Sequence, residues 1–244
     1  MIPKIIHYCW LSGDPIPERL QNYMKTWKEK LPDYEFMLWD KSRFDIHSMK
    51  WVEQAYAAKK YAFASDYIRL YAVYNYGGIY LDMDMEIIKA FDQEQFTKGV
   101  TWGLDESGDV EAAFLAGSGH NPVLKELMEW YEHAEFLNPD GTLNQQVANV
   151  YVQNHLKQYG YVKENKEQIL EACDVKLFPA DYFNCRSLVT GKLNVTENSC
   201  CIHWHTVLWA SKTTKFIQWL RLKVLVPMMG EKNYNKLQKL FGRA

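Results

Sequence analysis

The stretch from residue 61 to residue 86 constrains the fold more than any other part of this sequence. Residues 61–76 include Ala, Leu and many aromatic residues but no Pro or Gly, which favours a helix. Gly77 and Gly78 follow, and because glycine tolerates a left-handed backbone, this pair predicts the end of the helix. Residues 79–81 are Ile-Tyr-Leu, a short apolar run that predicts a buried strand. The stretch therefore predicts a helix and a strand joined by a glycine turn.

Two aspartates, Asp82 and Asp84, stand where this strand is expected to run out into a loop. Carboxylates separated by one residue at a strand end can both reach one hard cation, such as Mg²⁺ or Mn²⁺. Such a cation takes oxygen ligands, so it can be held between the protein and phosphate groups. The motif alone is a weak signal, since a chain of this length contains about one Asp-x-Asp by chance. A solvated turn with two acids is the alternative.

Three polar residues interrupt the apolar helix: Ser65, Asp66 and Arg69. Asp66 and Arg69 are three residues apart on one face, so an intrahelical ion pair also explains their spacing. The complete pattern, Ser65-Asp66-x-x-Arg69 followed by Gly-Gly-x-Tyr-x-Asp-x-Asp, resembles the signature of glycosyltransferase family 32. That family takes in bacterial capsule and lipopolysaccharide enzymes and fungal mannosyltransferases. It is also similar to the catalytic domain of the large clostridial glucosylating toxins.

The resemblance implies a metal-dependent, retaining glycosyltransferase that moves a hexose from a UDP- or GDP-linked sugar to a hydroxyl of a glycan or lipid-linked oligosaccharide. The implied product is a growing bacterial surface polysaccharide of the capsule or lipopolysaccharide type. The resemblance also implies that Asp82 and Asp84 hold Mn²⁺ or Mg²⁺ against the donor diphosphate. The implied catalytic residues are Asp66, Arg69 and Asp84, and the implied donor-binding residues include Ser65, Asp66, Arg69, Tyr80 and Asp82.

The beginning of the chain predicts an α/β fold. Residues 4–10 read as a strand, residues 17–30 as a helix and residues 34–39 as a second strand. We expect residues 1–212 to form a single GT-A-like domain, with a mixed, mostly parallel central sheet flanked by helices. Ligands of such a sheet bind beyond the carboxyl ends of its strands.

Trp10 ends the first expected strand and Asp40 the second, so both are expected near Asp82 at that edge. The opening sequence Ile-Pro-Lys-Ile-Ile-His-x-x-Trp also resembles family 32, in which the matching Trp lies against the nucleotide base. The resemblance places Trp10 in the donor site; the alternative is a core Trp that caps the sheet. No Gly-rich dinucleotide fingerprint or phosphate-binding Gly-Lys-Ser/Thr loop occurs, so phosphate binding is expected to depend on metal.

Residues 200–205, Cys-Cys-Ile-His-Trp-His, read as a late strand with two histidines. The closing block of family 32 resembles Ile-His-His-Trp followed by Ser-Trp, and His203 and Trp209 match it. Trp204 replaces the expected second His, and Leu208 stands where Ser is expected. By resemblance, His203 is the third metal ligand with His205 in reserve, and Trp209 belongs to the donor site. A core His pair near the sheet edge is the alternative.

The middle of the chain is expected to form the acceptor side. Residues 100–104 and 112–116 read as strands, and a helix is expected to begin near Pro122. Exposed acids and polar residues at a helix start would explain the candidate acceptor contacts equally well. These candidates are Asp105, Asn144 and Gln145.

The C-terminal part has a different charge from the rest. Residues 206–244 carry eight Lys or Arg and one Glu, whereas the whole chain has a formal net charge of −2. We expect residues 213–244 to form a basic amphipathic helical tail, interrupted at Pro227 and Gly230. A basic, Trp-containing helix of this kind suits an anionic membrane surface. An ordinary helix packed on the domain is the alternative.

Composition limits the location and the partners. Hydrophobic residues make up 48% of the 244, enough for one sizeable core. Five Cys without a Cys-x-x-Cys pair fit a reducing compartment better than a disulfide framework or a zinc site. No secretory signal or long apolar run is visible. We therefore expect a cytoplasmic enzyme, with peripheral contact to the inner face of the membrane and no nucleic-acid partner.

Two other functions remain open. A hydrophobic strand ending in Asp-x-Asp also describes Mg²⁺-dependent phosphatases with an aspartyl nucleophile, although these place the motif near the start of the chain. Aromatic residues form 15% of the sequence, which also suits a non-catalytic sugar-binding module. Such a module has no need for Asp82, Asp84, Asp66 and Arg69 to converge.

Overall fold

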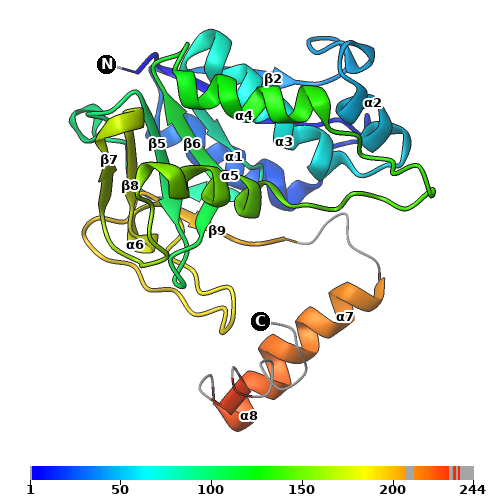
Figure 1. The fold of residues 1–244 in the computed structure, drawn as a ribbon. Helices are drawn as coiled ribbons and strands as arrows, with labels where there is room; N and C mark the ends of the chain where they lie inside the picture. The colour runs from blue at the N-terminus through cyan, green and yellow to red at the C-terminus, as the bar shows by residue number, and fades with distance from the viewer. Residues whose placement is uncertain (1, 207–211, 231–232, 235, 237–244) are drawn as a thin grey trace.

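The computed structural model describes residues 2–206, 212–230, 233–234 and 236 (Figure 1). Its centre is a seven-stranded mixed sheet in the order β2-β1-β3-β6-β5-β8-β7. The strands are β1 (Ile5–Cys9), β2 (Glu35–Trp39), β3 (Gly78–Leu81), β5 (Val100–Leu104), β6 (Val110–Gly117), β7 (Gln168–Leu170) and β8 (Val175–Phe178). A second, two-stranded sheet pairs β4 (Met85–Ile87) with β9 (Cys201–His203).

Five strands of the large sheet point the same way. β1 is parallel to both β2 and β3, and β5 is parallel to β8. β6 lies antiparallel between β3 and β5, and β7 runs antiparallel to β8 at the edge. This confirms the predicted α/β class and the GT-A-like architecture, with a mixed sheet in which most strands share one direction.

Helices cover the large sheet in two layers (Figure 1). One face carries the larger hydrophobic core, to which the four helices α2 to α5 contribute. The other face packs against the second core, built from α1, α6 and the β4–β9 sheet. The helices are α1 (Glu18–Lys30), α2 (Lys50–Ala57), α3 (Tyr61–Tyr76), α4 (Pro122–His133), α5 (Ala148–Leu156) and α6 (Ala180–Phe183).

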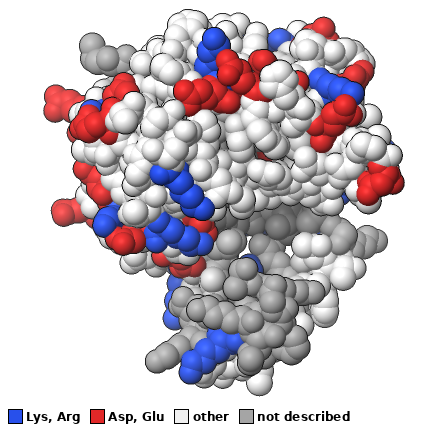
Figure 2. Space-filling view, viewed as in Figure 1, with Lys and Arg blue, Asp and Glu red and all other residues white. Residues whose placement is uncertain are grey.

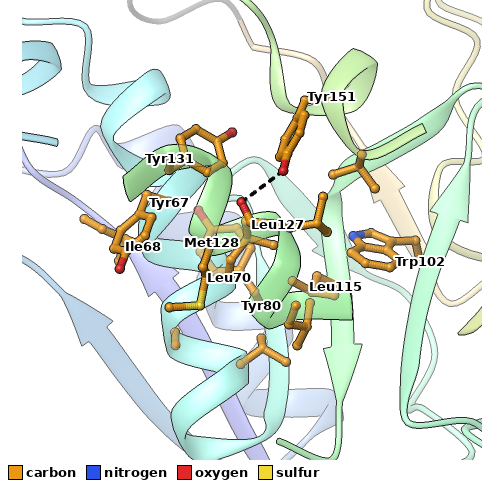
Figure 3. Close-up of a cluster of buried hydrophobic side chains, with 14 of the residues drawn as sticks. Tyr67, Ile68, Leu70, Tyr80, Trp102, Leu115, Leu127, Met128, Tyr131 and Tyr151 are labelled. Carbon is orange, nitrogen blue, oxygen red and sulfur yellow. Dashed lines mark hydrogen bonds between the residues drawn. The ribbon is translucent and has the colours of Figure 1, made fainter. Parts of the chain in front are cut away.

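The larger core is rich in aromatic side chains and lies between the helices and β3, β5 and β6 (Figure 3). Trp102 and Tyr80 are each 1% exposed. Tyr151 packs its ring against Trp130 and donates its hydroxyl hydrogen to the carbonyl of Leu127 at 3.3 Å. A buried phenol that keeps a hydrogen-bond partner adds apolar contact without the cost of an unsatisfied hydroxyl. Much of the aromatic content of the sequence is therefore used in this core.

The glycine turn after α3 has the predicted conformation. Gly77 and Gly78 have φ values of +64° and +98°. A side chain on Gly78 would bring its Cβ within 2.7 Å of the carbonyl oxygen of Ile5, in the neighbouring strand β1. Glycine is therefore required both by the backbone conformation and by the close approach of β1. The turn brings β3 alongside β1 immediately after the helix ends.

The C-terminal segment is a helical rod joined to the rest through residues that the structure does not describe (Figure 1). It comprises α7 (Lys212–Leu220), a π-helical turn (Arg221–Leu225) and α8 (Val226–Met229). The prediction that Pro227 interrupts the helix is wrong. Pro227 lies in the first turn of α8, where a missing N–H is tolerated, and the preceding π turn accommodates it. The described helix ends at Gly230, as expected.

None of the described helices is long and apolar enough to cross a bilayer. In the view of Figure 2, acidic side chains are concentrated around the upper body, whereas the charged side chains of the C-terminal rod are basic. The described residues from 213 onward include the bases Lys215, Arg221, Lys223 and Lys236 and no acid.

Candidate active site

The carboxyl ends of β1 and β3 meet at one edge of the large sheet and open onto a cavity of about 320 Å³. Cys9 and Trp10 line it from the end of β1, and Asp82 and Asp84 from the loop after β3. Parallel neighbouring strands bring these segments together although more than seventy residues separate them in the sequence. The other walls include Ser65 and Arg69 of α3 and His203, His205, Thr206, Leu188 and Gln218.

Arg69 joins the helix to the first aspartate of the loop. Its Nη2 atom lies 2.8 Å from Oδ1 of Asp66 and 3.6 Å from Oδ1 of Asp82, and its Nη1 donates to the carbonyl of Ala112 at 2.5 Å. Tyr80 donates its hydroxyl hydrogen to the same Asp82 oxygen at 3.0 Å. The guanidinium also lies over the Tyr80 ring, 4.9 Å from its centroid. Arg69 is 5% exposed, so this network is fixed within the protein.

His203 joins the second aspartate to a third carboxylate. The β4–β9 ladder places His203 opposite Met85, the residue after Asp84. As a result, Nε2 of His203 lies 3.3 Å from Oδ1 of Asp84, and its Nδ1 lies 3.8 Å from Oε2 of Glu111. Thr206 donates from its backbone N–H at 2.5 Å and from its hydroxyl at 2.8 Å to Oδ2 of Asp84.

Burial and neighbouring charges separate the pKa values of these carboxyl groups. Burial raises the pKa of Asp66 to about 7, although Arg69 opposes the shift. The pKa of Asp82 is also raised by burial, against Arg69. Burial acts in the same direction on Asp84, but the His203 charge and the hydrogen bonds from His203 and Thr206 outweigh it and hold that pKa well below its ordinary value. Asp84 is therefore the carboxyl group that stays ionised most firmly.

Glu111 and His203 stabilise each other's charged form. Burial would raise the pKa of Glu111, but the interaction with His203 is stronger and lowers it to about 2. Burial would lower the pKa of His203, but Asp84 and Glu111 raise it well above its ordinary value. Burial, together with the charge of His203, lowers the pKa of His205 to about 3, so His205 is neutral at physiological pH.

Comparison with known proteins shows what this arrangement resembles. Residues 17–100 match the family described as the glycosyltransferase sugar-binding region containing a DXD motif. This part of the chain is similar to the DXD-containing region of glycosyltransferases. The match includes Ser65, Asp66, Arg69, Tyr80 and both aspartates of the motif, so the resemblance to family 32 is confirmed.

Named relatives of this DXD domain come from different kinds of organism. Inositol phosphoceramide mannosyltransferase 3 of Schizosaccharomyces pombe is 37% identical over 95 residues, which are 37% of this chain and 26% of that protein. Toxin Afp18 of Yersinia ruckeri is 38% identical over 88 residues, 34% of this chain and 4% of that protein. The chain matches only 25% to 30% of the length of the three fission-yeast mannosyltransferases.

A solved structure shares the fold of this DXD glycosyltransferase domain. The PaToxG glycosyltransferase superposes with a TM-score of 0.51 and 21% identity, covering 64% of this chain and 68% of that one. At this identity the likeness concerns the fold, and it agrees with the GT-A-like architecture.

The residues of the DXD site fit a divalent cation. Ligand atoms of Asp82, Asp84 and His203 lie within 4.8 Å of one another, and so do those of Glu111, His203 and His205. Nδ1 of His203 is buried and has no hydrogen-bond partner among the described residues. Carboxylates with one imidazole favour a transition metal such as Mn²⁺ over Mg²⁺, which prefers oxygen ligands alone.

Trp10 lies at the rim between two hollows. It lines the main cavity together with a neighbouring hollow of about 570 Å³, in whose wall Asp40 also lies. Its indole N–H donates to the carbonyl of Asp14 at 2.7 Å. Asp40 accepts the hydroxyl hydrogen of Ser42 at 2.6 Å and caps the turn after β2. The structure therefore brings both residues to the expected edge, with Trp10 partly exposed rather than enclosed in a core.

The predicted acceptor residues lie away from the main cavity, and their role stays a prediction. Asp105 accepts hydrogen bonds from Ser107 and Asp109 within the β5–β6 turn. Asn144 and the exposed Gln145 belong to the long segment between α4 and α5. Trp209, predicted for the donor site, lies outside the described residues.

Sequence reasoning did not identify Glu111, Thr206 or Gln218, all of which contribute to the site. Glu111 is in β6 and reaches the aspartates through His203, a contact that no local pattern announces. Thr206 directly follows the two predicted histidines, so its hydroxyl group next to the His-x-His pattern could have indicated a role in the site. Gln218 lines the cavity from α7 and donates to the carbonyl of His205 at 3.2 Å.

Proposed function

We propose that this chain transfers a hexose from a nucleotide diphosphate sugar, UDP- or GDP-linked, to a hydroxyl group of a glycan. The observation that supports this most directly is the convergence of Arg69, Asp82, Asp84 and His203 on one cavity that Trp10 also lines. A cavity with fixed carboxylates at one end and an indole at the rim suits a ligand that has both a diphosphate and a flat base. The fungal relatives named as mannosyltransferases support a hexose donor.

In this proposal Asp82 and Asp84, with His203, hold Mn²⁺ or Mg²⁺ and Trp10 contacts the base. The cation would neutralise the charge that develops on the departing nucleotide. Asp66 and Arg69 hold Asp82 in position through the ion pairs at 2.8 and 3.6 Å, and orient the donor sugar and phosphate. Ser65 and Tyr80 complete the donor wall.

We propose retention of anomeric configuration by attack on the same face as the leaving group. Among the described residues that line the cavity, the only carboxylates are Asp82 and Asp84. Both are assigned to the metal, so the cavity wall offers no separate carboxylate for a covalent glycosyl intermediate. The acceptor hydroxyl would then attack within a tight ion pair.

The acceptor in this proposal is a growing, lipid-linked bacterial surface polysaccharide, of the capsule or lipopolysaccharide type. The support is the C-terminal rod, which exposes Phe216, Ile217 and Trp219 next to Lys215 and Lys223. Exposed aromatic and basic residues on one helix suit the surface of an anionic bilayer. We therefore propose two functional parts, a catalytic domain at residues 1–212 and a membrane-contacting tail at residues 213–244, with the enzyme on the cytoplasmic face of the membrane.

The donor half of this proposal is tested by thermal unfolding with UDP- and GDP-sugars in Mn²⁺ and in EDTA. One nucleotide class should stabilise the wild type in Mn²⁺, because a ligand at 100 times its Kd adds about 2.7 kcal/mol to the free energy of unfolding. EDTA and Asp84→Asn should abolish the stabilisation. Asp140→Asn, an exposed acid that accepts only from Thr142, is the matched control. A folded wild type that no nucleotide stabilises in either condition would refute the proposal.

A further inference from the structure

Two arginines lie against Trp204, the residue that follows the β9 strand, and a third lies close enough to one of them to act on its charge. Arg19 of α1 and Arg186 both lie against the Trp204 ring, with their guanidinium carbons 5.9 and 5.6 Å from its centroid. Arg221, in the π turn of the C-terminal rod, donates to the carbonyl of Leu188 at 3.0 Å, two residues after Arg186. Tyr23 stacks on the same indole, with 5.9 Å between ring centroids. We call Arg19, Arg186 and Arg221 the arginine cluster.

No carboxylate forms an ion pair with the arginine cluster among the residues that the structure describes. Its hydrogen bonds go to neutral oxygens: the Tyr23 hydroxyl for Arg19, the Trp204 carbonyl for Arg186 and the Leu188 carbonyl for Arg221. The buried Nε atoms of Arg186 and Arg221 have no hydrogen-bond partner in the described part of the chain. Burial, together with the charges of Arg19 and Arg221, lowers the pKa of Arg186, while Asp84 opposes this shift.

Stacking on Trp204 accounts for only part of this arrangement. A cation over an aromatic ring gains about 0.5–1 kcal/mol at an exposed site, but the ring leaves the positive charge uncompensated. Stacking also offers no role for Arg221 or for the two unfilled Nε donors. Arg186 and Arg221 are partly buried, and such guanidinium groups normally have an anionic partner; the exposed Arg19 adds a third positive charge that repels the other two. An anion with several acceptor oxygens would satisfy both the charge and the free donors.

The arginine cluster adjoins the cavity without lining it. Leu188 and Gln218, which belong to the same segments as Arg186 and Arg221, do line the cavity. Trp204 links the two places, because its backbone N–H donates to the carbonyl of Asp84 while its carbonyl accepts from Arg186. Its indole N–H donates to a carboxylate oxygen of Glu86 at 2.8 Å. In the proposed function, the metal on Asp82 and Asp84 is the positive charge for the donor diphosphate. The arginine cluster therefore provides a second group of positive charges, in addition to the metal. It lies next to the cavity, on the side formed by the C-terminal elements.

We propose that the arginine cluster binds a phosphate group of the acceptor, so that the acceptor class is a sugar or polyol hydroxyl carried on a phosphate ester. This inference rests on the proposed transferase function and specifies its second substrate. The phosphate would occupy the space between Arg19, Arg186 and Arg221, and the attached hydroxyl compound would extend past Leu188 towards the cavity.

The test is calorimetric titration of the full chain with glycerol 1-phosphate, in the presence of Mn²⁺ and a saturating amount of the nucleoside diphosphate found in the donor test. Glycerol is the uncharged counterpart. We expect glycerol 1-phosphate to bind and glycerol not to, and Arg186→Gln and Arg19→Gln each to weaken binding at least fivefold. Arg43→Gln is the matched control, since Arg43 also lies over an indole, that of Trp39, and donates to a single carbonyl. Arg19 is exposed, so its variant stays informative if Arg186→Gln unfolds.

Three results would overturn the inference while leaving the transferase proposal intact. In the first, the nucleotide binds but glycerol 1-phosphate does not. In the second, glycerol 1-phosphate competes with the nucleotide, and Arg186→Gln weakens the binding of both equally, which assigns the arginine cluster to the donor. In the third, phosphatidylglycerol vesicles would bind the wild type, displace glycerol 1-phosphate and lose affinity equally in Arg186→Gln, which assigns the phosphate to a bilayer headgroup. If no nucleotide binds under any condition, the proposed function fails, and this inference fails with it.

Discussion

Arg69 is the residue on which the geometry of the site most depends. It is 5% exposed, and one guanidinium group contacts Asp66, Asp82 and the Ala112 carbonyl. Lysine would provide the charge but not the planar arrangement of donors that reaches three partners at once. Helical spacing offered the Asp66–Arg69 ion pair as the alternative to a role in the donor site; the structure contains this ion pair and extends it to Asp82 of the DXD loop.

Arg69→Met should therefore destabilise the protein strongly, since it removes the counter-charge from the buried Asp66 and from the partly buried Asp82. Removing one partner of a buried ion pair costs about 3–5 kcal/mol. Urea unfolding of the wild type and the variant measures this loss. The double variant Asp66→Asn/Arg69→Met removes one of the stranded charges and should recover part of it. A single variant within 1 kcal/mol of the wild type would show that the network contributes little to stability.

His7 is a second buried polar residue, and it belongs to the scaffold rather than to the site. It is fully buried; it donates from Nε2 to the Gly77 carbonyl at 2.7 Å and accepts at Nδ1 from the Trp39 indole at 3.1 Å. The bond from Trp39 requires the neutral imidazole, because a protonated Nδ1 cannot accept, whereas Nε2–H can donate to Gly77 in either protonation state. Burial lowers its pKa to about 4, although the bond to Gly77 opposes the shift.

The shift at His7 predicts a pH dependence of stability. Because the folded pKa lies below the ordinary value of 6.5, the unfolded chain binds the proton first, and stability falls as the pH drops from 6.5 towards 4. The loss from this residue approaches about 3 kcal/mol at pH 4. Other groups titrate in this window, so the quantity to measure is the difference between the wild type and His7→Gln in urea unfolding at several pH values. A difference that stays constant between pH 7 and pH 4 would contradict the prediction.

At the scale of elements, the glycine turn between α3 and β3 fixes the DXD loop relative to β1. Gly78→Ala should be strongly destabilising, because its Cβ would lie 2.7 Å from the Ile5 carbonyl, in addition to the positive φ. Gly141→Ala is the matched control, with φ +82° but no atom within 4 Å of the added Cβ. The control should lose about 1 kcal/mol of unfolding free energy, and Gly78→Ala about 1–3 kcal/mol more. Equal losses in denaturant unfolding would show that the backbone conformation alone matters.

Helices and strands that follow from a local sequence pattern could be predicted. Strands that depend on contacts with distant parts of the chain could not. The helix–Gly-Gly–strand unit was correct because every feature of it lies within one stretch, from Tyr61 to Leu81. β7 and β8 were not predicted, since they are three and four residues long and are stable only as partners of β5 and of each other. The ladder of β4 with β9 likewise joins segments more than 110 residues apart, and that ladder brings His203 to Asp84, where it also meets Glu111 of β6.

At the scale of the whole molecule, the C-terminal rod is connected to the catalytic cavity and exposes an apolar surface as well. Gln218 lines the cavity, whereas Phe216 and Trp219 are 59% and 53% exposed and stack on one another. A helix with exposed aromatics and basic residues partitions into the interface of an anionic bilayer. In the proposed function, the same rod would place the cavity near a membrane-bound acceptor.

Deleting residues 213–244 should move the protein from the membrane fraction to the soluble fraction, because each basic residue near an anionic surface contributes about 1 kcal/mol and the aromatics add apolar burial.

The double variant Phe216→Ser/Trp219→Ser keeps Gln218 and should weaken binding to phosphatidylglycerol vesicles in co-sedimentation. Tyr76→Ser, which removes an aromatic 45% exposed at the end of α3, is the control and should bind as the wild type does. Raising the salt concentration should weaken the wild-type interaction, since screening reduces the electrostatic part. Unchanged partitioning after the deletion would show that the tail packs on the domain and does not contact a membrane.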